Sequence, residues 1–410
     1  MEEKNTQSRK FWSGLVTGLL LAILIMGTAF LVKQLSVIRA MKQSGKDVSE
    51  ADQLVNSFTT TKMGVLEDTI RQYYLEEVDQ ATLENGVYEG IVDSLKDPYS
   101  VYYSTEALEE INQKTEGIYY GIGAYITRDP QSDYCMISGV IANTPAQEAG
   151  LQQDDVIYKI DGEDVIGLET SELVTKIKGE EGTIVHMTIV RRATNETLEF
   201  DVERRKIESP TVESSMEEDG IGYIQITEFD DVTEDQFAEA LAVCKESGMK
   251  GLILDLRSNP GGNLNTVCEI CRMLLPKGLI VYTEDKYGKR DEYSCEGDRQ
   301  LEVPLVVLVN GYSASASEIL AGAVKDYGIG TIMGTTTFGK GIVQRIISLS
   351  DGSAVKLTVS KYYTPKGNNI HGIGIEPDIM VEFDAEKYNE EDFDNQLEAA
   401  KEELRKQMGN

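Results

Sequence analysis

The sequence predicts a chain of several domains, in which a helical segment and a small α+β domain precede a larger α/β core. Its 410 residues exceed one ordinary core, because single domains usually hold about 100–200 residues. Two continuous apolar runs, at 252–256 and 303–309, are typical of strands covered on both faces. An uncharged stretch from 11 to 32 adds a predicted membrane anchor near the N-terminus.

The predicted anchor is long enough to span a bilayer. As a helix it would reach about 33 Å, against a hydrocarbon core of about 30 Å. Basic residues flank it on both sides, so charge alone orients it weakly, and Trp12 stands at one end as in an aromatic belt. A cleaved signal peptide is the alternative, but its apolar region would be about 7–15 residues long and a cleavage site would follow. We therefore expect a retained, single-pass anchor in the cell membrane.

Composition excludes several classes of partner and site. The 39 basic residues against 70 acidic ones give a net charge of -31, which argues against nucleic acid, since phosphate binding needs a basic surface. Two histidines, His186 and His371, cannot fill a three-histidine metal site, and we expect no metal and no cofactor. The cysteines are too few and too scattered for a disulfide scaffold: Cys135, Cys244, Cys268, Cys271 and Cys295.

Changes of hydrophobic period set the predicted boundaries. Helical spacing, as in Met63, Leu66 and Ile70, gives way after residue 116 to short β-rich runs, and then to strands that alternate with helices. The hairpin signal Asp351-Gly352 lies between two alternating runs. The predicted parts are a short tail (1–10), the anchor (11–32), a polar linker (33–56), a helical segment (57–116), the small domain (117–206), the core (207–385) and an acidic helix or tail (386–410).

Within the small domain, two glycines stand at the entry of a strand, in Tyr120-Gly121-Ile122-Gly123-Ala124. Glycines let successive backbone N–H groups turn inward and hold an anion, although an ordinary tight turn is the alternative. The segments 143–146, 149–151, 154–157 and 160–162 follow in an order that closely resembles a PDZ domain. The resemblance implies that a peptide's C-terminal carboxylate binds at Gly121, Ile122, Gly123 and Ala124, while the peptide adds a strand to the sheet edge.

In the core, a serine-rich turn follows an apolar strand that ends at Val309 and precedes a predicted helix. A serine at such a turn can act as a nucleophile, and the first helical turn offers free N–H groups that could hold an oxyanion. The alternative is that Ser313, Ser315 and Ser317 are helix N-caps. The pattern alone does not choose among the three.

Lys340 lies between two glycines in an apolar setting. Burial disfavours the charged amine and could bring its pKa from about 10.4 towards neutrality. A neutral lysine can accept a serine proton and return it to a leaving amine. A surface lysine in a glycine turn and a phosphate-binding loop are the alternatives, but Gly341 follows Lys340 where the Walker pattern needs Ser or Thr.

Three segments of the core, 255–262, 313–319 and 338–341, together with Gln344, resemble the signature of the C-terminal processing peptidases, also called tail-specific proteases. The resemblance covers nearly all of 57–383, including 97–100 and 374–378. It implies a PDZ domain ahead of an α/β protease core related to the crotonase superfold.

The same resemblance implies roles for individual residues. Ser315 would be the nucleophile and Lys340 the general base, and Gln344, one turn later if this stretch is helical, would orient the lysine. The oxyanion hole would combine the N–H of Ala316 with one from the Gly261-Gly262 turn.

The leading hypothesis is therefore an anchored serine endopeptidase that acts through an acyl-enzyme on proteins with free, apolar C-termini. By resemblance its catalytic part lies outside the cytoplasm, and processing of signalling factors is one of several roles found among relatives. A homodimer through the N-terminal helices and the C-terminal tail is a further expectation. The rival hypotheses are a non-catalytic PDZ scaffold that binds C-terminal tails, and an acyl-CoA enzyme.

Overall fold

The computed structural model describes residues 53–129 and 132–409, which separate into one compact unit up to Val87 and another from Tyr88 onward. The predicted tail, the anchor and most of the linker lie outside the described residues. Within the described ranges, no helix combines the length and hydrophobicity needed to cross a bilayer.

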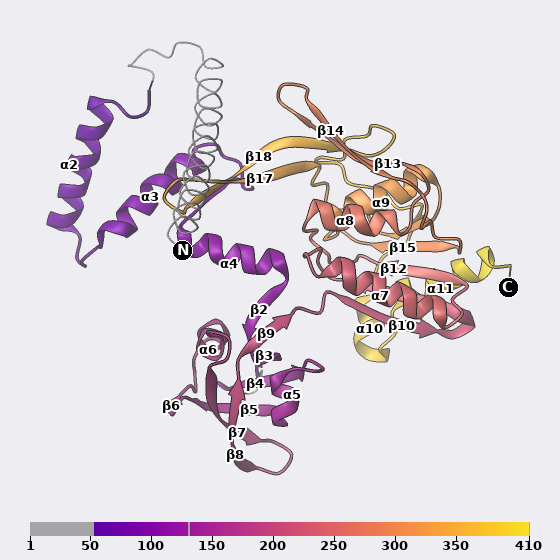
Figure 1. The fold of residues 1–410 in the computed structure, drawn as a ribbon, viewed down its shortest axis with the longest axis horizontal. Coiled ribbons are helices and arrows are strands. Elements are labelled where there is room, and N and C mark those ends of the chain that lie inside the picture. Colours follow the sequence, from indigo (N-terminus) through magenta and orange to yellow (C-terminus); the bar gives the residue numbers. More distant parts are fainter. Residues whose placement is uncertain (1–52, 130–131, 410) are drawn as a thin grey trace, which may run out of the picture. The chain divides into compact units, whose positions relative to one another are not determined.

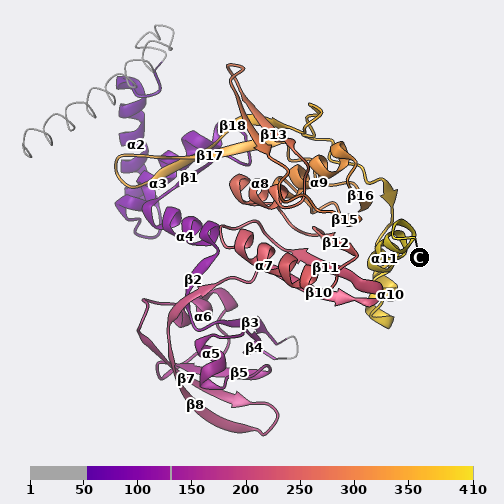
Figure 2. The same cartoon turned by 45° about the vertical axis from the view of Figure 1, so that its right-hand side comes forward.

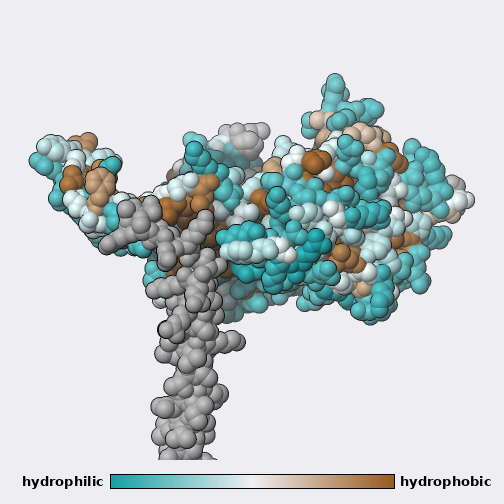
Figure 3. Space-filling model, turned by 90° about the horizontal axis from the view of Figure 1, so that it is seen from above, coloured by the Kyte–Doolittle hydropathy of each residue, from teal (hydrophilic) through white to brown (hydrophobic). Residues whose placement is uncertain are grey.

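The first unit contains helix α2 (Ser57–Tyr73) and the start of α3 (Gln80–Asp93), as the helical spacing predicted. Asn56 caps α2 by accepting hydrogen bonds from the N–H groups of Phe58 and Thr59. No residue of α2 is buried, and hydrophobic groups are visible on the surface of this unit in Figure 3.

A small domain of short strands and two short helices lies between α4 (Thr105–Glu116) and the core, and short β-rich runs were predicted there (Figure 1). The strands are β2 (Ile118–Gly121), β3 (Ala124–Arg128), β4 (Cys135–Val140), β5 (Asp155–Ile160), β6 (Glu163–Asp164), β7 (Ile184–Arg191), β8 (Glu196–Glu203) and β9 (Arg205–Glu208); the helices are α5 (Pro145–Ala149) and α6 (Thr170–Ile177). The main sheet has the order β3-β4-β5-β7-β8, so β3 is an edge strand. An edge strand beside a helix leaves backbone groups open to an added strand.

The core is built on a six-stranded sheet of order β10-β11-β12-β15-β16-β19. Its strands are β10 (Val212–Glu217), β11 (Ile221–Ile226), β12 (Gly251–Asp255), β15 (Leu305–Val309), β16 (Thr331–Gly334) and β19 (Ile379–Met380), and η2 (Glu218–Gly220) joins the first two. All neighbours are parallel except β10 and β11. Every residue of β12 and β15 is buried, which confirms the prediction from their apolar runs.

Alternate side chains of these strands pack against different helices. Leu254 and Val307 belong to the hydrophobic cluster with α7 (Thr233–Glu246), α8 (Leu264–Arg272) and α9 (Ala316–Tyr327). Ile253 and Val306 belong to a second cluster with Leu404 of α11 (Asn395–Gln407). Figure 2 shows the sheet between these helices. The parallel sheet is therefore covered on both faces, as such sheets require.

A second sheet of the core centres on β18 (Ala354–Tyr363), which pairs with β17 (Ile342–Ser348), β13 (Gly278–Asp285) and β1 (Val101–Tyr103). β14 (Arg290–Cys295) extends it beyond β13, and α4 (Thr105–Glu116) follows β1. The predicted hairpin turn at Asp351-Gly352 connects β17 to β18.

The C-terminal segment, predicted as one acidic helix or tail, forms two helices, α10 (Ala385–Glu391) and α11. The chain breaks at Asp392, whose φ of 54° is incompatible with a continuous helix. Ala400 and Leu404 are fully buried, so α11 is part of the core and not a free tail.

Candidate active site

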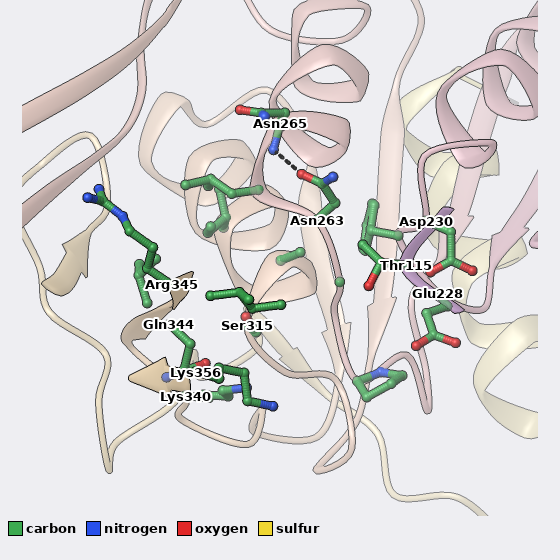
Figure 4. A pocket seen from close by; sticks show the side chains of 18 of the residues that line it. Thr115, Glu228, Asp230, Asn263, Asn265, Ser315, Lys340, Gln344, Arg345 and Lys356 are labelled. Carbon is green, nitrogen blue, oxygen red and sulfur yellow. Dashed lines mark hydrogen bonds between the residues drawn. The ribbon is translucent and has the colours of Figure 1, made fainter. Parts of the chain in front are cut away.

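A pocket of about 580 Å³ in the core brings together most of the residues singled out from the sequence (Figure 4). Ser315, Ala316, Lys340, Gln344 and Gly262 all line it. Its walls come from the end of α4, the segment 228–230, the turn 260–265, the start of α9, and strands β17 and β18. Figure 4 shows Ser315 with Lys340 and Lys356 on one side, and Glu228 and Asp230 on the other.

The structure separates the three serines of the turn. The Ser313 hydroxyl donates to the carbonyl of Leu256 at 2.8 Å, and the Ser317 hydroxyl donates to the carbonyl of Asn259 at 3.0 Å. Both serines are fully buried, whereas Ser315 lines the pocket. Ser315 is therefore the serine whose position suits a nucleophile.

Ser315 has an unusual backbone conformation, with φ 54° and ψ -110°. Such conformations cost free energy for a residue other than glycine and persist only where the surroundings hold them. Its N–H donates to the Glu318 carboxylate at 2.9 Å, and its carbonyl accepts from the Tyr362 hydroxyl at 3.1 Å. These contacts hold the turn in place at the start of α9.

Glu318, which the sequence analysis did not single out, connects the turn that holds Ser315 to the loop that holds Lys340. This lysine loop comprises residues 335–341, between β16 and β17. Its buried carboxylate accepts hydrogen bonds from the Thr337 hydroxyl (2.6 Å) and from the N–H groups of Gly339 (2.7 Å), Lys340 (2.8 Å) and Ser315 (2.9 Å). Its place three residues after a serine at a helix start is the capping-box pattern, which was a signal available in the sequence.

Lys340 is half-buried beside this network. Its Nζ lies 4.8 Å from the centre of the Tyr99 ring. Burial lowers the pKa of its amine and the charge of Lys356 lowers it further, while Glu318 and Asp97 act in the opposite direction. In the described part of the chain its Nζ forms no ion pair and no hydrogen bond. A lysine without a counter-ion in a partly dry site is the kind that can act as a base.

Gln344 corrects one sequence prediction. We considered a helical turn between Lys340 and Gln344, but residues 342–348 form strand β17. The β-branched residues Ile342, Val343 and Ile346 favour a strand there. The Gln344 side chain lines the pocket and donates to the Thr358 hydroxyl at 3.2 Å, not to Lys340.

The Gly261-Gly262 turn lies directly against the serine turn. Gly261 has φ 105°, and a Cβ there would come within 2.8 Å of the Ser315 Cβ and 2.9 Å of the Ala316 nitrogen. The Gly261 N–H already donates to the Asn259 side chain at 2.8 Å. Among the described residues, the N–H groups of Gly262 and Ala316 have no acceptor. Both residues line the pocket, so both N–H groups are free to donate to a bound group.

The glycine loop of the small domain is held by the start of α5. Ile122 accepts a hydrogen bond from the Ala146 N–H at 2.8 Å, and Gly123 accepts one from Ile141 at 3.0 Å. Gly123 has φ 83°, and a Cβ there would lie only 2.3 Å from the Thr144 Cβ. The loop runs from Gly121 at the end of β2 to Ala124 at the start of the edge strand β3.

Cys268 and Cys271 are fully buried on α8 and belong to the hydrophobic core. Burial raises the pKa of the Cys268 thiol to about 12. His186 lies on strand β7, with Nδ1 2.6 Å from Asp201 Oδ1. Within residues 53–129 and 132–409, no group of three or more His, Cys, Asp or Glu side chains could hold a metal ion.

Comparison with known protein families finds three matching regions. Residues 220–381 match peptidase family S41, residues 136–191 match the PDZ domain, and residues 22–107 match the N-terminal domain of the activating protease CtpB.

Individual relatives agree with these matches. The chain is 33% identical over 377 residues to the carboxy-terminal processing protease CtpA of Bacillus subtilis, covering 92% of this chain and 78% of the relative. It is 36% identical over 318 residues to CtpB of the same organism, covering 77% of this chain and 66% of the relative.

A solved structure, the putative S41 protease of Bacteroides fragilis, has a TM-score of 0.52 and 18% identity, over 84% of this chain and 97% of that one, which supports the fold. With the PDZ domain and the protease core both present, the chain belongs to peptidase family S41 and is a serine-type endopeptidase of the carboxy-terminal processing group.

Proposed function

We propose that the chain hydrolyses peptide bonds with a Ser315–Lys340 dyad, and that its PDZ domain selects substrates by their C-terminal tails. One observation carries the catalytic part of the proposal. The only serine of the turn that lines the pocket shares it with a half-buried lysine whose amine has a lowered pKa and no counter-ion in the described chain.

In the proposed reaction, the neutral amine of Lys340 accepts the proton of the Ser315 hydroxyl as the oxygen attacks the substrate carbonyl. The N–H groups of Ala316 and Gly262 stabilise the negative charge on the carbonyl oxygen. The Lys340 ammonium then gives its proton to the leaving amine, and an acyl-enzyme remains on Ser315. Lys340 next activates the water that hydrolyses this ester.

Because Gln344 lies on strand β17 and forms no hydrogen bond with Lys340, we assign it a role other than orienting the lysine directly. Its amide donates to Thr358 on β18, and the Thr358 N–H donates to the Ser100 hydroxyl at 3.2 Å. We propose that Gln344 fixes the wall of the pocket on which Lys340 lies.

The dyad is tested with the purified full chain and an unstructured protein as substrate. Ser315→Ala and Lys340→Ala should each lower kcat/KM by at least about 10³-fold, because each removes a group that reacts directly. The matched controls are Ser294→Ala and Lys361→Ala, at exposed positions outside the pocket. An alkyl fluorophosphonate should transfer its phosphonyl group to the serine oxygen of the parent chain, with loss of fluoride, and should not label Ser315→Ala. Near-normal cleavage by either active-site variant would contradict the proposal.

Tail recognition is the second part of the proposal. The open edge of β3, the helix α6 beside it and the glycine loop at its start support it, together with the PDZ match. Substrates with a free, apolar C-terminus should therefore be cleaved faster than the same substrates with an amidated C-terminus. Short peptides that occupy only the Ser315 pocket should be cleaved at the same rate with a free and with an amidated C-terminus. If long substrates are cleaved equally fast with and without a free C-terminal carboxylate, the proposal that the PDZ domain recognises substrate tails is wrong.

The membrane anchor at 11–32 and an extracytoplasmic catalytic part remain proposals from the sequence. The chain should stay with the membrane fraction in alkaline carbonate, and an external protease should reach the catalytic part in intact, wall-stripped cells. Light scattering of the purified chain tests the proposed homodimer.

A further inference from the structure

The pocket contains a second lysine that the proposed reaction does not use. Lys356, on strand β18, lines the same pocket as Ser315 and Lys340, and Figure 4 shows it beside Lys340. Two positive charges in one partly dry pocket repel each other, so the state in which both lysines are protonated is raised in free energy. The arrangement needs a physical explanation.

The two amines are held in place by one segment of the chain. Lys340 Nζ lies 4.8 Å from the Tyr99 ring centre, and Lys356 Nζ lies 5.3 Å from the Tyr103 ring centre. Both distances are within the range of about 6 Å in which a cation is attracted to an aromatic face. The Tyr103 ring therefore favours the charged form of Lys356, and the Tyr99 ring favours the charged form of Lys340, so a further charge must oppose Tyr99 if Lys340 is to be a base. The two tyrosines belong to residues 97–103, whose Asp97-Pro98-Tyr99-Ser100 motif stood out in the sequence without an assigned role.

Backbone pairing fixes this segment against Lys356. Strand β1 pairs with β18 in a register that places Val101 opposite Lys356 and Tyr102 opposite Val355. The Ser100 hydroxyl accepts from the Thr358 N–H at 3.2 Å, two residues further along β18. Lys356 therefore cannot turn away from the lysine loop without leaving an aromatic face that the sheet holds in position.

Besides Lys356, two charged groups act on Lys340: Glu318, which lies on α9, and Asp97, which lies ahead of β1. Arg345 also lines the pocket, from β17. The Glu318 carboxylate accepts four hydrogen bonds, and Asp97 accepts from the Ser100 hydroxyl (2.7 Å) and the Tyr99 N–H (3.1 Å). Both carboxylates favour the ammonium form of Lys340, and Lys356 is the cation that opposes them.

We propose that Lys356 is a positioning residue of the reaction, whose positive charge, held on β18 beside the lysine loop, keeps the Lys340 amine free of its proton. This inference deepens the proposed function and rests on Lys340 as the general base. A cationic neighbour is one of the established ways to make a lysine reactive.

The test compares pH profiles of kcat/KM for the full chain with a short fluorogenic peptide. Lys356→Gln removes the charge, so the acidic limb of its profile should move to higher pH, with about a tenfold loss at pH 7 that disappears towards pH 10. Lys356→Arg keeps the charge and should keep the limb near its original place. Lys361→Gln, which removes the same charge from an exposed position on the same strand, is the control.

A second measurement separates this inference from the proposed function. In a Ser315→Ala background, competitive acetylation followed by mass spectrometry reports the titration of the Lys340 amine without any need for activity. Lys356→Gln and Lys356→Met should both move that titration to higher pH. If Ser315→Ala or Lys340→Ala alone still cleaves, the proposed function fails; if these variants are inactive while the Lys340 titration is the same with and without Lys356, only the role of Lys356 is overturned.

Discussion

Two buried carboxylates, those of Glu318 and Asp230, lie on opposite walls of the pocket and differ in their hydrogen bonding. Glu318 is fully buried beside Ser315, and its carboxylate accepts four hydrogen bonds. Asp230, on the opposite wall, is only 6% exposed, yet its carboxylate has no hydrogen bond or ion pair in the described part of the chain. The two residues have similar burial and very different surroundings.

The two carboxylates differ in the number of hydrogen-bond donors that face them. Backbone N–H groups of the serine turn and the lysine loop point at Glu318, and fixed donors of this kind stabilise a buried negative charge. Among residues 53–129 and 132–409, no hydrogen-bond donor reaches the Asp230 carboxylate. Burial raises its pKa to about 7, the charges of Glu228 and Asp231 add to this, and Lys114 opposes it. We infer that the wall with Ser315 and Lys340 is held rigid by hydrogen bonds, while the opposite wall responds to pH.

The largest expected effect comes from breaking the Glu318 network. Glu318→Gln replaces an acceptor of four hydrogen bonds with an amide whose NH₂ group faces donors, so kcat/KM should fall by about 100-fold or more through misplacement of Ser315 and Lys340. The free energy of unfolding should fall by about 2–3 kcal/mol. Urea unfolding and peptide kinetics measure both, with Glu302→Gln, an exposed glutamate, as the control. A variant with normal kinetics would show that the network is not needed for positioning.

The sequence predicted the local elements well because their signals are local. Helix α5 and strand β5 lie within the series of short segments from 143 to 162 whose order indicated the small domain. The apolar runs likewise identified β12 and β15, since burial on both faces favours apolar residues in a strand. Asp255, the last residue of β12, is the exception, and its buried carboxylate forms an ion pair with Arg257.

The parts of the site that the sequence did not reveal depend on tertiary contacts. Tyr99 and Asp97 reach Lys340 across more than two hundred residues of chain, because β1 pairs with β18. Gln344 was considered as a helical neighbour of Lys340 on spacing alone, although the β-branched residues around it were the better signal. The three serines of the turn could not be distinguished until the acceptors of Ser313 and Ser317 were known.

Substitution of Asp230, on the opposite wall, should change the free energy of unfolding by a smaller amount and in the opposite direction. Because the pKa of Asp230 is higher in the folded chain than in the unfolded one, its contribution to stability is fully present below about pH 4 and is lost as the pH rises through about 7. Asp230→Asn should therefore stabilise the chain by about 1–2 kcal/mol at pH 8 and by nothing comparable at pH 4. Denaturation followed from pH 4 to 8, beside the exposed control Asp298→Asn, measures this. A constant difference between variant and parent at every pH would contradict the assignment.

The smallest effect should come from Glu228, which lies next to Asp230 and forms a 3.6 Å ion pair with Lys114. Lys114 is 65% exposed and Glu228 is 32% exposed, so solvent screens the pair, and its loss in Glu228→Gln should change the free energy of unfolding by less than about 0.5 kcal/mol. The same variant removes a negative neighbour of Asp230, so the pH at which Asp230 loses its stabilising proton should move down.

A double-mutant cycle makes this last expectation decisive. In the Asp230→Asn background, Glu228→Gln has no carboxyl to act upon at position 230, so the pH-dependent part of its effect should disappear while the small pH-independent part remains. If the pH-dependent part survives, the titrating group is not Asp230, and the contrast between the two walls must then be attributed to another acid near Lys114.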